Sequence, residues 1–383
     1  MTPNDVAELG WIPVADLKDR IARIREAMRE REIEVLLVAG HQDIFNRGHI
    51  RYISNLGRGG NIVLPLEGNL TYYLHPALVN SPKLHKGGSI SDFIDVLPFG
   101  DGAYGLINDS VGKIRSMNVQ GKVGYVGGAS IGIAVHDQLI DTVGRDRLVD
   151  ASDIFWQLRT IKSENELALM RRSAVMADDC LDEIRPLIRA GVSDYEIYAA
   201  AKRYLFERQS PYSLEVIDAH GPFMNFEQYP HGDVLERGGT LMMEITPAYG
   251  GYYAQLPFTL PVDELSPSMR RLAEAWQAGF ELGESMLRPG MRVSELSKAL
   301  RARIAEAGAV NPFSHGHAIG LDVYDGWGLA DNVEFELRPG MTFAMHPAAI
   351  TEVGGESFSC GYTFLITEDG AERLSRHDFT QGW

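Results

Sequence analysis

The stretch that decides the fold reads L-R-T-I-K-S-E-N-E-L-A-L-M-R-R-S-A and covers residues 158–174. Ser163 and Glu166 stand in it at the S-x-x-E spacing of a capping box, in which each side chain bonds the backbone of the other residue at a helix start. The spacing predicts a long helix over residues 164–188. We place a domain boundary at this stretch, because the chain before it has a different pattern.

A faint internal repeat follows the first helix. Ser193 and Glu196 form a second capping box and predict a helix over residues 194–208. The sequence R-A-G-V-S-D-Y-E-I around Ser193 returns as R-P-G-M-R-V-S-E-L around Ser294, where we expect another helix to begin. Strands are expected after each helix pair, at residues 240–245, 252–260, 341–345 and 362–367. Two related α–α–β units would pack their strands into one sheet with the helices outside.

The chain before the boundary alternates helix-like and strand-like segments. Apolar residues from Leu17 to Met28 recur at helical spacing and predict an amphipathic helix. A second helix is expected near residues 131–139. Apolar runs predict strands at residues 35–39, 50–53, 61–66, 71–74 and 122–126. This order indicates an α/β domain with a mixed sheet.

Composition excludes several classes of protein. The 383 residues carry 36 Lys and Arg against 52 Asp and Glu, a net charge of −16, so a binder of nucleic acid is not expected. Two cysteines cannot form a disulfide framework. The chain shows neither a signal peptide nor an apolar run long enough for a membrane span. We expect a cytoplasmic protein that acts on a small polar molecule and has no membrane partner.

Histidine titrates near neutral pH and serves as acid, base and metal ligand, so its distribution indicates where chemistry could occur. Five of the 11 histidines fall between residues 220 and 346, in glycine- and proline-rich turns or at the ends of expected strands. They are His220, His231, His315, His317 and His346.

Several segments, in the same order, resemble the creatinase/prolidase/aminopeptidase P family. The first is the stretch 158–174. The others are Y-P-H-G-D-V-L-E-R-G-G (229–239), M-E-I-T-P-A-Y-G-G-Y-Y-A-Q-L-P-F-T (243–259), H-G-H-A-I-G-L-D-V-Y-D (315–325), L-R-P-G-M-T-F-A-M-H-P (337–347) and F-L-I-T-E-D-G (364–370). The resemblance implies a creatinase-like N-terminal α/β domain over residues 1–158. It also implies an α+β pita-bread catalytic domain over residues 159–383 and a homodimer.

The departures from the family pattern concern its metal site. Peptidases of this family hold two divalent cations with two Asp, one His and two Glu. Position by position, these ligands become Glu244, Gln255, His317, His346 and Gly361. A single carboxylate remains, whereas a pair of hard divalent cations requires bridging oxygens. The family's second substrate histidine is replaced by Tyr324. The chain is therefore identified as a non-peptidase member with degenerate metal ligands, similar in style to creatinase and the ectoine hydrolases.

In a first interpretation the site needs no cofactor. His231 matches the catalytic histidine of creatinase, and it would relay a proton between water and a leaving nitrogen. Glu244 would anchor a cationic or N–H-bearing group. Creatine is a poor candidate, because the two glutamates that would hold its guanidinium fall on Pro257 and His346. The substrate would be an amidino compound, a cyclic amidine such as ectoine, or an amide.

A second interpretation gives the site one divalent metal ion, held by Glu244, Gln255, His317 and His346. Two imidazoles and one carboxylate suit iron or zinc with open positions, and the enzyme would then be a hydrolase or a lyase. A third interpretation is a non-catalytic binding protein.

The remaining candidate residues concern substrate. Catalytic roles are also expected for His317, His346 and Tyr324, and substrate contacts for Tyr252, Gln255, His220, Arg51 and Arg58. The two arginines enter through the resemblance, because N-domain arginines of the family can reach the partner's site and grip a carboxylate.

Overall fold

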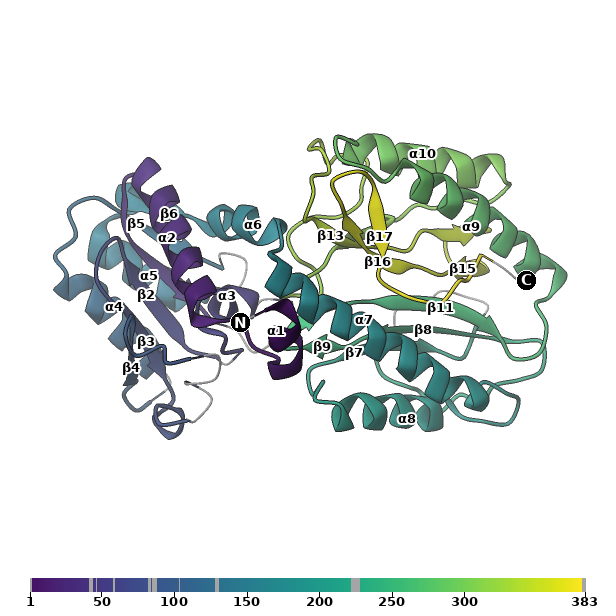
Figure 1. The fold of residues 1–383 in the computed structure, drawn as a ribbon, viewed down its shortest axis with the longest axis horizontal. Coiled ribbons are helices and arrows are strands. Elements are labelled where there is room, and N and C mark those ends of the chain that lie inside the picture. Colours follow the sequence, from purple (N-terminus) through teal and green to yellow (C-terminus); the bar gives the residue numbers. More distant parts are fainter. Residues whose placement is uncertain are drawn as a thin grey trace. The chain divides into compact units, whose positions relative to one another are not determined.

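The computed structural model describes residues 2–40, 44–45, 47–57, 59–81, 84, 88–102, 104–127, 131–221 and 228–380. The chain divides into two compact units, Met1–Arg159 and Thr160–Trp383 (Figure 1). The first unit has the mixed α/β architecture and the second the α+β architecture predicted from the sequence, so the fold class is confirmed.

The first unit is built on a six-stranded sheet with the order β4-β3-β2-β1-β5-β6. Its strands are β1 (Ile33–Ala39), β2 (Asn61–Pro65), β3 (Leu70–Leu74), β4 (Ile94–Pro98), β5 (Lys122–Val126) and β6 (Leu148–Asp150). Its helices are α1 (Pro3–Leu9), α2 (Val14–Glu30), α3 (Gly48–Ser54), α4 (Gly105–Ser116) and α5 (Ile133–Val143), followed by α6 (Ser152–Thr160) at the boundary. β1 pairs parallel to β5 and antiparallel to β2, which makes the sheet mixed.

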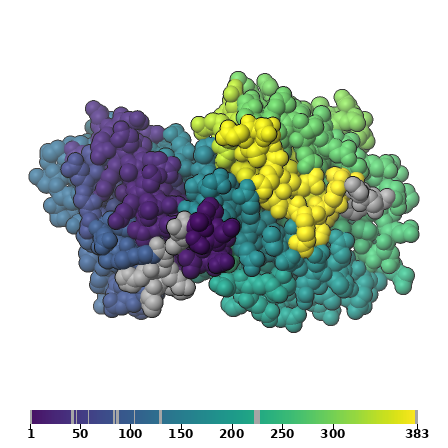
Figure 2. Space-filling model, in the orientation of Figure 1, coloured from purple at the N-terminus to yellow at the C-terminus, as the bar shows by residue number. Residues whose placement is uncertain are grey.

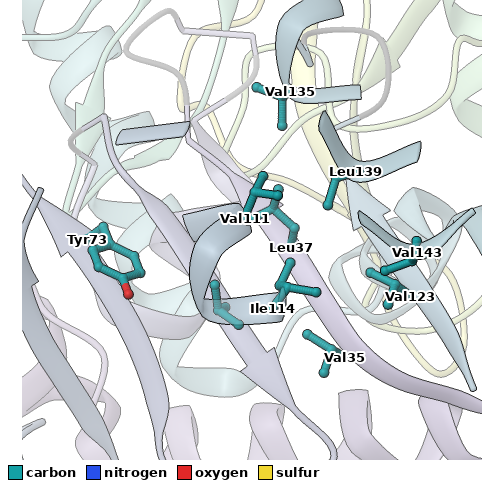
Figure 3. Close-up of a cluster of buried hydrophobic side chains, with 10 residues drawn as sticks. Val35, Leu37, Tyr73, Val111, Ile114, Val123, Val135, Leu139 and Val143 are labelled. Carbon is teal, nitrogen blue, oxygen red and sulfur yellow. The ribbon is translucent and has the colours of Figure 1, made fainter. Parts of the chain in front are cut away.

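One buried core cluster of this unit lies between the sheet and helices α4 and α5 (Figure 3). Val35 and Leu37 of β1 face Val111 and Ile114 of α4, and all four side chains are buried. Alternate residues of a strand point to the same face, so this pair presents one apolar surface to the helices. The predicted amphipathic helix is also present: α2 buries the whole apolar series from Leu17 to Met28.

One predicted strand in this unit is wrong. Residues 50–53 lie in the helix α3, whose buried positions include Ile50 and Ile53 at helical spacing. A short apolar run does not distinguish a strand from a buried helix, and here the left-handed Asn55 ends the helix.

The second unit carries four long helices. They are α7 (Glu164–Ile184), α8 (Asp194–Glu207), α9 (Pro267–Met286) and α10 (Val293–Glu306). Both predicted capping boxes are confirmed, since Ser163 and Ser193 accept from the backbone of the residue three positions on. The helix expected from Ser294 is present as α10, which begins one residue earlier, and the Ser294 hydroxyl bonds the Glu334 carboxylate at 3.1 Å rather than capping the helix.

The strands of this unit form two principal ladders, β11-β8-β7 and β12-β13-β16-β17. Their bounds are β7 (Leu214–Asp218), β8 (Thr240–Thr246), β11 (Leu256–Pro261), β12 (Gly316–Ala318), β13 (Thr342–Met345), β16 (Tyr362–Ile366) and β17 (Ala371–Arg373). Two short hairpins pair β9 (Ala248–Tyr249) with β10 (Tyr252–Tyr253) and β14 (Ala348–Ile350) with β15 (Ser357–Ser359).

The prediction that all these strands form one sheet is therefore wrong, because they form two separate ladders that meet at the join between β11 and β16. Where β11 meets the chain before β16, the Gly361 amide donates to the Pro257 carbonyl at 2.9 Å. The Thr259 hydroxyl and the Cys360 thiol make further bonds there. Pro257 has no N–H, so it cannot donate a backbone hydrogen bond back to the chain before β16. Side-chain hydrogen bonds therefore supply the other contacts between β11 and that chain.

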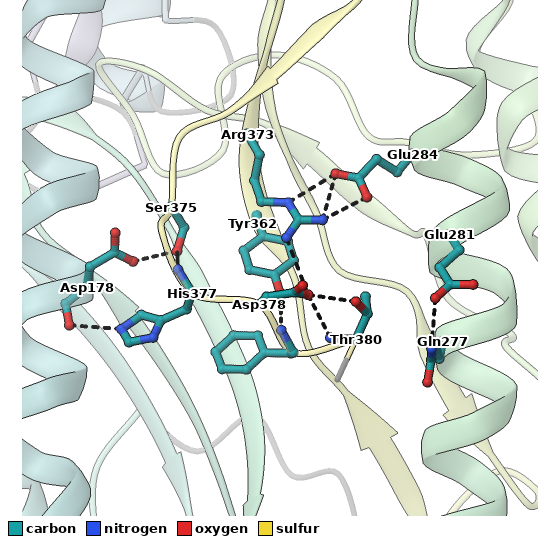
Figure 4. A network of polar contacts seen from close by, with 11 residues as sticks. Asp178, Gln277, Glu281, Glu284, Tyr362, Arg373, Ser375, His377, Asp378 and Thr380 are labelled. Atoms are coloured by element: carbon teal, nitrogen blue, oxygen red, sulfur yellow. Dashed lines mark hydrogen bonds and ion pairs between the residues drawn. The ribbon is translucent and has the colours of Figure 1, made fainter. Parts of the chain in front are cut away.

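The C-terminal segment, from Arg373 at the end of β17 onward, is anchored to distant elements (Figure 4). Arg373 forks onto Glu284 of α9 at 2.7–3.0 Å, and the His377 Nε2 donates to the Asp178 carbonyl of α7 at 3.2 Å. Phe379 is buried and stacks on Tyr362 at 5.5 Å between ring centroids. In the space-filling view this yellow segment lies at the surface, beside the teal residues of α7 (Figure 2). Across the described residues, none of the helices has the length and apolar character of a membrane span.

Candidate active site

The candidate site lies where the two ladders of the second unit meet. Glu244 is in the centre of β8, where it pairs with Val216 of β7 on one side and with Pro257 of β11 on the other. The carbonyl of Pro257 accepts from Gly361, which stands just before β16. This row of backbone contacts joins Glu244 to the second ladder. We call Glu244, Gln255, His317, His346 and Gly361 the central cluster.

Gln255 is tied to both ladders. Its backbone N–H donates to the Thr363 hydroxyl at 2.8 Å, and its carbonyl accepts from the same hydroxyl at 3.2 Å. Thr363 of β16 pairs with Ala344 of β13, which in turn pairs with His317 of β12. The fold thus brings together residues that are far apart in the sequence, such as Gln255 and Thr363, which are separated by 108 positions.

Glu244 and Gln255 form a buried hydrogen-bonded pair. The Gln255 Nε2 donates to the Glu244 Oε2 at 2.9 Å, and the two residues are only 6% and 4% exposed. Burial raises the pKa of Glu244 to about 7, against the opposing effect of the Gln255 hydrogen bond. A carboxyl group with this pKa exchanges its proton near neutral pH, as a group in acid–base catalysis must.

Three aromatic rings gather at the end of β12. The His317 ring lies 5.3 Å from the His346 ring in a T-shaped contact, and 5.3 Å from the Tyr324 ring at an angle of 30°. His346 follows β13, and its backbone N–H donates to the carbonyl of His315 at 2.9 Å. The structure therefore brings together three of the predicted catalytic residues.

Both imidazoles of this group are neutral at pH 7. Burial lowers the pKa of His317, and burial together with the adjacent His317 ring lowers the pKa of His346 to about 3. The His317 Nδ1 lies 3.1 Å from the Ala318 carbonyl, and the backbone of Val323 is a second hydrogen-bond partner of the imidazole. Backbone carbonyls only accept, so the ring acts as the donor in these contacts.

Gly361 leaves no room for a ligand. A Cβ atom at this position would lie 2.3 Å from the Met345 carbonyl oxygen and 2.4 Å from the His346 Cβ. The backbone of His346 occupies the space into which a glutamate at 361 would project. The two replacements are thus coupled sterically.

The central cluster does not fit a pair of divalent cations. It contains one carboxylate, Glu244, and the amide of Gln255 presents an N–H to that carboxylate rather than a second anion. Over the residues that the structure describes, His, Cys, Asp and Glu side chains form no group of three or more suited to hold a metal ion. Two buried acceptors of the cluster, the Gln255 Oε1 and the His346 Nε2, have no protein hydrogen-bond partner among the described residues.

His231 and His220 belong to a neighbouring segment. The backbone N–H of His231 donates at 2.7 Å to Asp194, the first residue of α8, and the side chain of His231 is exposed. The His220 Nδ1 lies 3.2 Å from the Asp233 carboxylate, which places His220 beside the turn that carries His231. The approach of His231 to the central cluster stays a prediction, and residues 222–227 lie outside the described part.

Tyr252 has a packing role in the structure. Its side chain is 1% exposed, its hydroxyl donates to the Glu166 carboxylate at 2.9 Å, and its carbonyl accepts from Ser173. The hydroxyl is therefore engaged with α7 rather than presented to a substrate. Arg51 lies on α3 of the first unit with its guanidinium 5.8 Å from the Trp11 ring, and Arg58 lies outside the described residues.

Two features of the site were missed from the sequence. Asp194 holds the His231 turn through both carboxylate oxygens, which bond the amides of His231 and Gly232. A buried ion pair joins Lys162 to Asp325, the residue after Tyr324. All of these residues fall in or beside the quoted motifs, but only the fold shows that they touch.

Comparison with known proteins agrees with this architecture. Residues 168–368, more than half of the chain, match metallopeptidase family M24, and residues 20–161 match the creatinase/prolidase N-terminal domain. A Bacillus subtilis protein described as the uncharacterized peptidase YqhT is 27% identical over 60% of this chain, and the match spans 65% of that protein. The Xaa-Pro dipeptidase of Pyrococcus horikoshii is 23% identical over 94% of this chain and 97% of its own length.

Solved structures share the fold at low sequence identity. The prolidase from Pyrococcus horikoshii superposes with a TM-score of 0.79 at 20% identity and covers 94% of this chain and 99% of its own. The Xaa-Pro dipeptidase from Bacillus anthracis has a TM-score of 0.80 at 19% identity, with coverage of 94% and 98%. The chain belongs to the M24 family of hydrolases, with a creatinase/prolidase N-terminal domain before its pita-bread domain.

Proposed function

We propose that this M24 protein is a metal-independent hydrolase that cleaves a C–N bond in a small polar metabolite. The substrate is an amidino compound, a cyclic amidine or an amide. His231 acts as the acid/base, and Glu244 binds an N–H-bearing group of the substrate. The protein acts as a homodimer in the cytoplasm.

The observation that carries this proposal is the make-up of the central cluster. Peptidases of the family typically use divalent metals, yet Glu244 is the sole carboxylate at the five ligand positions of this chain. Its Oε2 accepts a hydrogen bond from Gln255, and position 361 has no space for a side chain. An acceptor-rich cluster of this kind suits an N–H donor better than it suits two cations.

The reaction follows from proton transfers that these residues can make. His231 accepts a proton from water as the water oxygen bonds to the substrate carbon, and it then donates that proton to the departing nitrogen as the C–N bond breaks. The products are a C–OH or C=O compound and an amine. Glu244 exchanges its own proton near pH 7, so it can be ionised beside a positively charged substrate nitrogen and protonated beside a neutral one.

A screen of small amides and amidines, with amine or ammonia release as the readout, would identify a substrate. With that substrate, His231→Ala should lower kcat by at least about 100-fold, because a general base contributes this much. His136→Ala, on α5 of the first unit, is the matched control and should leave kcat unchanged. A rate unaffected by His231→Ala would reject the role of His231, and inactivation by dialysis against a chelator would reject metal independence.

A single bound metal ion is the second candidate. The buried Gln255 Oε1 and His346 Nε2 have no hydrogen-bond partner among the residues that the structure describes, and both atom types can bind a metal ion. The arrangement would need Glu244 or Gln255 to complete the set with His317 and His346. Elemental analysis of the purified protein decides between the two: about one Fe, Zn, Mn or Ni per chain, lost in His317→Ala, would establish this candidate in place of the first.

A further inference from the structure

A buried ion pair lies next to Tyr324, one of the three residues whose rings meet at the end of β12. The Lys162 Nζ is 3.2 Å from the Asp325 Oδ2, and the two side chains are 2% and 1% exposed. Two long-range segments meet here, since Lys162 precedes α7 and Asp325 follows β12. Buried ion pairs contribute little net stability, because desolvation of both charges offsets their attraction. Their presence therefore calls for another explanation.

The chain provides a fitted space for this pair. A Cβ atom at position 320 would lie 2.3 Å from the Asp325 Oδ2 and 2.8 Å from the Lys162 Cε, so Gly320 is the residue that admits both side chains. The backbone of Lys162 is itself fixed, because its N–H donates to the Gly340 carbonyl at 2.9 Å. Lys162 is thus a rigid attachment point for the segment around Asp325.

Asp325 is linked to the His317 ring through one carbonyl group. The Ala318 carbonyl accepts from the backbone N–H of Asp325 at 2.9 Å and from the His317 Nδ1 at 3.1 Å. A shift of Asp325 would therefore alter one of the backbone hydrogen bonds that orient the imidazole. The effect on His317 is direct, because the Asp325 N–H and the His317 Nδ1 bond the same carbonyl oxygen.

Tyr324 is the other residue that this segment positions. Its side chain is 44% exposed, and its ring lies over His317 at 5.3 Å and 30°. Gly328 gives it room, since a Cβ atom there would lie 3.0 Å from the Tyr324 hydroxyl. Because nearly half of Tyr324 is exposed, packing holds its ring from one side, and the backbone next to it helps to place the ring on His317.

We propose that the Lys162–Asp325 ion pair is a positioning device that holds the Tyr324 ring against His317 and fixes the direction of the His317 imidazole. The inference rests on the proposed function in one respect, namely that Tyr324 and His317 belong to the active site. Lys162 and Asp325 are both buried, and they act through Tyr324 and the Ala318 carbonyl.

The test is a histidine NMR experiment on the full-length protein. The Hε1 resonance of His317 is identified by its loss in His317→Gln, and Tyr324→Leu shows how far it moves when the ring is removed. Asp325→Asn, and the double variant Lys162→Met with Asp325→Asn, should each move this resonance by at least half of that shift. Glu284→Gln is the control, because it breaks the Arg373 ion pair of the same unit (Figure 4) and should leave the resonance in place.

The outcomes separate positioning from stability. An unmoved His317 resonance in folded Asp325→Asn or in the double variant, with only a lower unfolding temperature, would overturn the proposal. A shift equal to that of Glu284→Gln would do the same. Because the readout requires no substrate, it can succeed even when His231→Ala shows that the proposed reaction is wrong. Once a substrate is known, Asp325→Asn should lower kcat with a smaller effect on KM.

Discussion

At the scale of single residues, Glu244 shows how burial changes the chemistry of a retained carboxyl group. It sits in the middle strand of a ladder, and among the described residues no Lys or Arg forms an ion pair with it. The neutral form is therefore favoured, and the pKa rises to about 7. The same fold position in a two-cation site would keep such a group ionised.

Replacement of Glu244 should reveal this pKa through the pH dependence of stability. Between its ordinary pKa of 4.5 and about 7, the folded chain retains a proton that the unfolded chain has lost, so the free energy of unfolding falls as the pH rises. In Glu244→Gln the free energy of unfolding should fall by up to about 3 kcal/mol less than in the wild type over this pH range. Urea unfolding at pH 5 and pH 8 measures it, with the exposed Glu281→Gln as the control. A difference from wild type that is equal at both pH values would contradict the assignment.

His346 should have the opposite effect on the acid side. Burial lowers its pKa from 6.5 to about 3, so the unfolded chain takes up a proton first, and stability is lost as the pH falls below 6.5. His346→Gln should reduce the loss between pH 6.5 and pH 5 by about 2 kcal/mol. His136→Gln serves as the control in the same denaturation series. If both variants follow the wild-type curve, His346 is not the group responsible.

At the scale of secondary-structure elements, the join between β11 and β16 determines what the site can hold. The chain before β16 passes so close to the end of β13 that Gly361 touches the backbone of His346. Both replacements of family ligands at this join, His for Glu and Gly for Glu, are thus parts of one packing arrangement. Restoring a glutamate at only one of positions 346 and 361 would therefore disturb the packing at the other position.

Gly361→Ala tests this close approach. The added Cβ meets a carbonyl oxygen at 2.3 Å, and overpacking of a dense interior costs about 1–3 kcal/mol. We expect a loss in that range in urea unfolding, together with a moved His346 resonance. Gly370→Ala is the matched control, since no heavy atom lies within 4 Å of its added Cβ. Equal stabilities of the two variants would show that the backbone around position 361 can move to accommodate the added Cβ.

At the scale of the whole molecule, the two compact units and the tethered C-terminal segment define the protein. The polar network around Arg373, Asp178 and His377 connects α7 and α9 to the last strands, so residues from both helix pairs of the second unit share one anchor (Figure 4). The family resemblance also implies a homodimer, in which a partner subunit would contribute residues to the site.

The oligomeric state is the prediction at this scale. Sedimentation equilibrium should give twice the chain mass of 42.4 kDa at micromolar concentration. If Arg51 or Arg58 reaches the partner's site, Arg51→Ala and Arg58→Ala should raise KM for a carboxylate-bearing substrate while the dimer persists. A 42.4 kDa species at all concentrations would end the hypothesis of a shared site.

The sequence by itself determined the family, the fold class, the capped helices α7 and α8, and the identities at the ligand positions, because these depend on local spacing and on side-chain type. It could not distinguish the helix at residues 50–53 from a strand, since a short apolar run fits both. Only the tertiary structure decided that Tyr252 bonds α7, that Gly361 and His346 share one space, and that Lys162 meets Asp325. These contacts, and the raised pKa of Glu244, depend on burial and on distances between strands far apart in the chain, which no local pattern encodes.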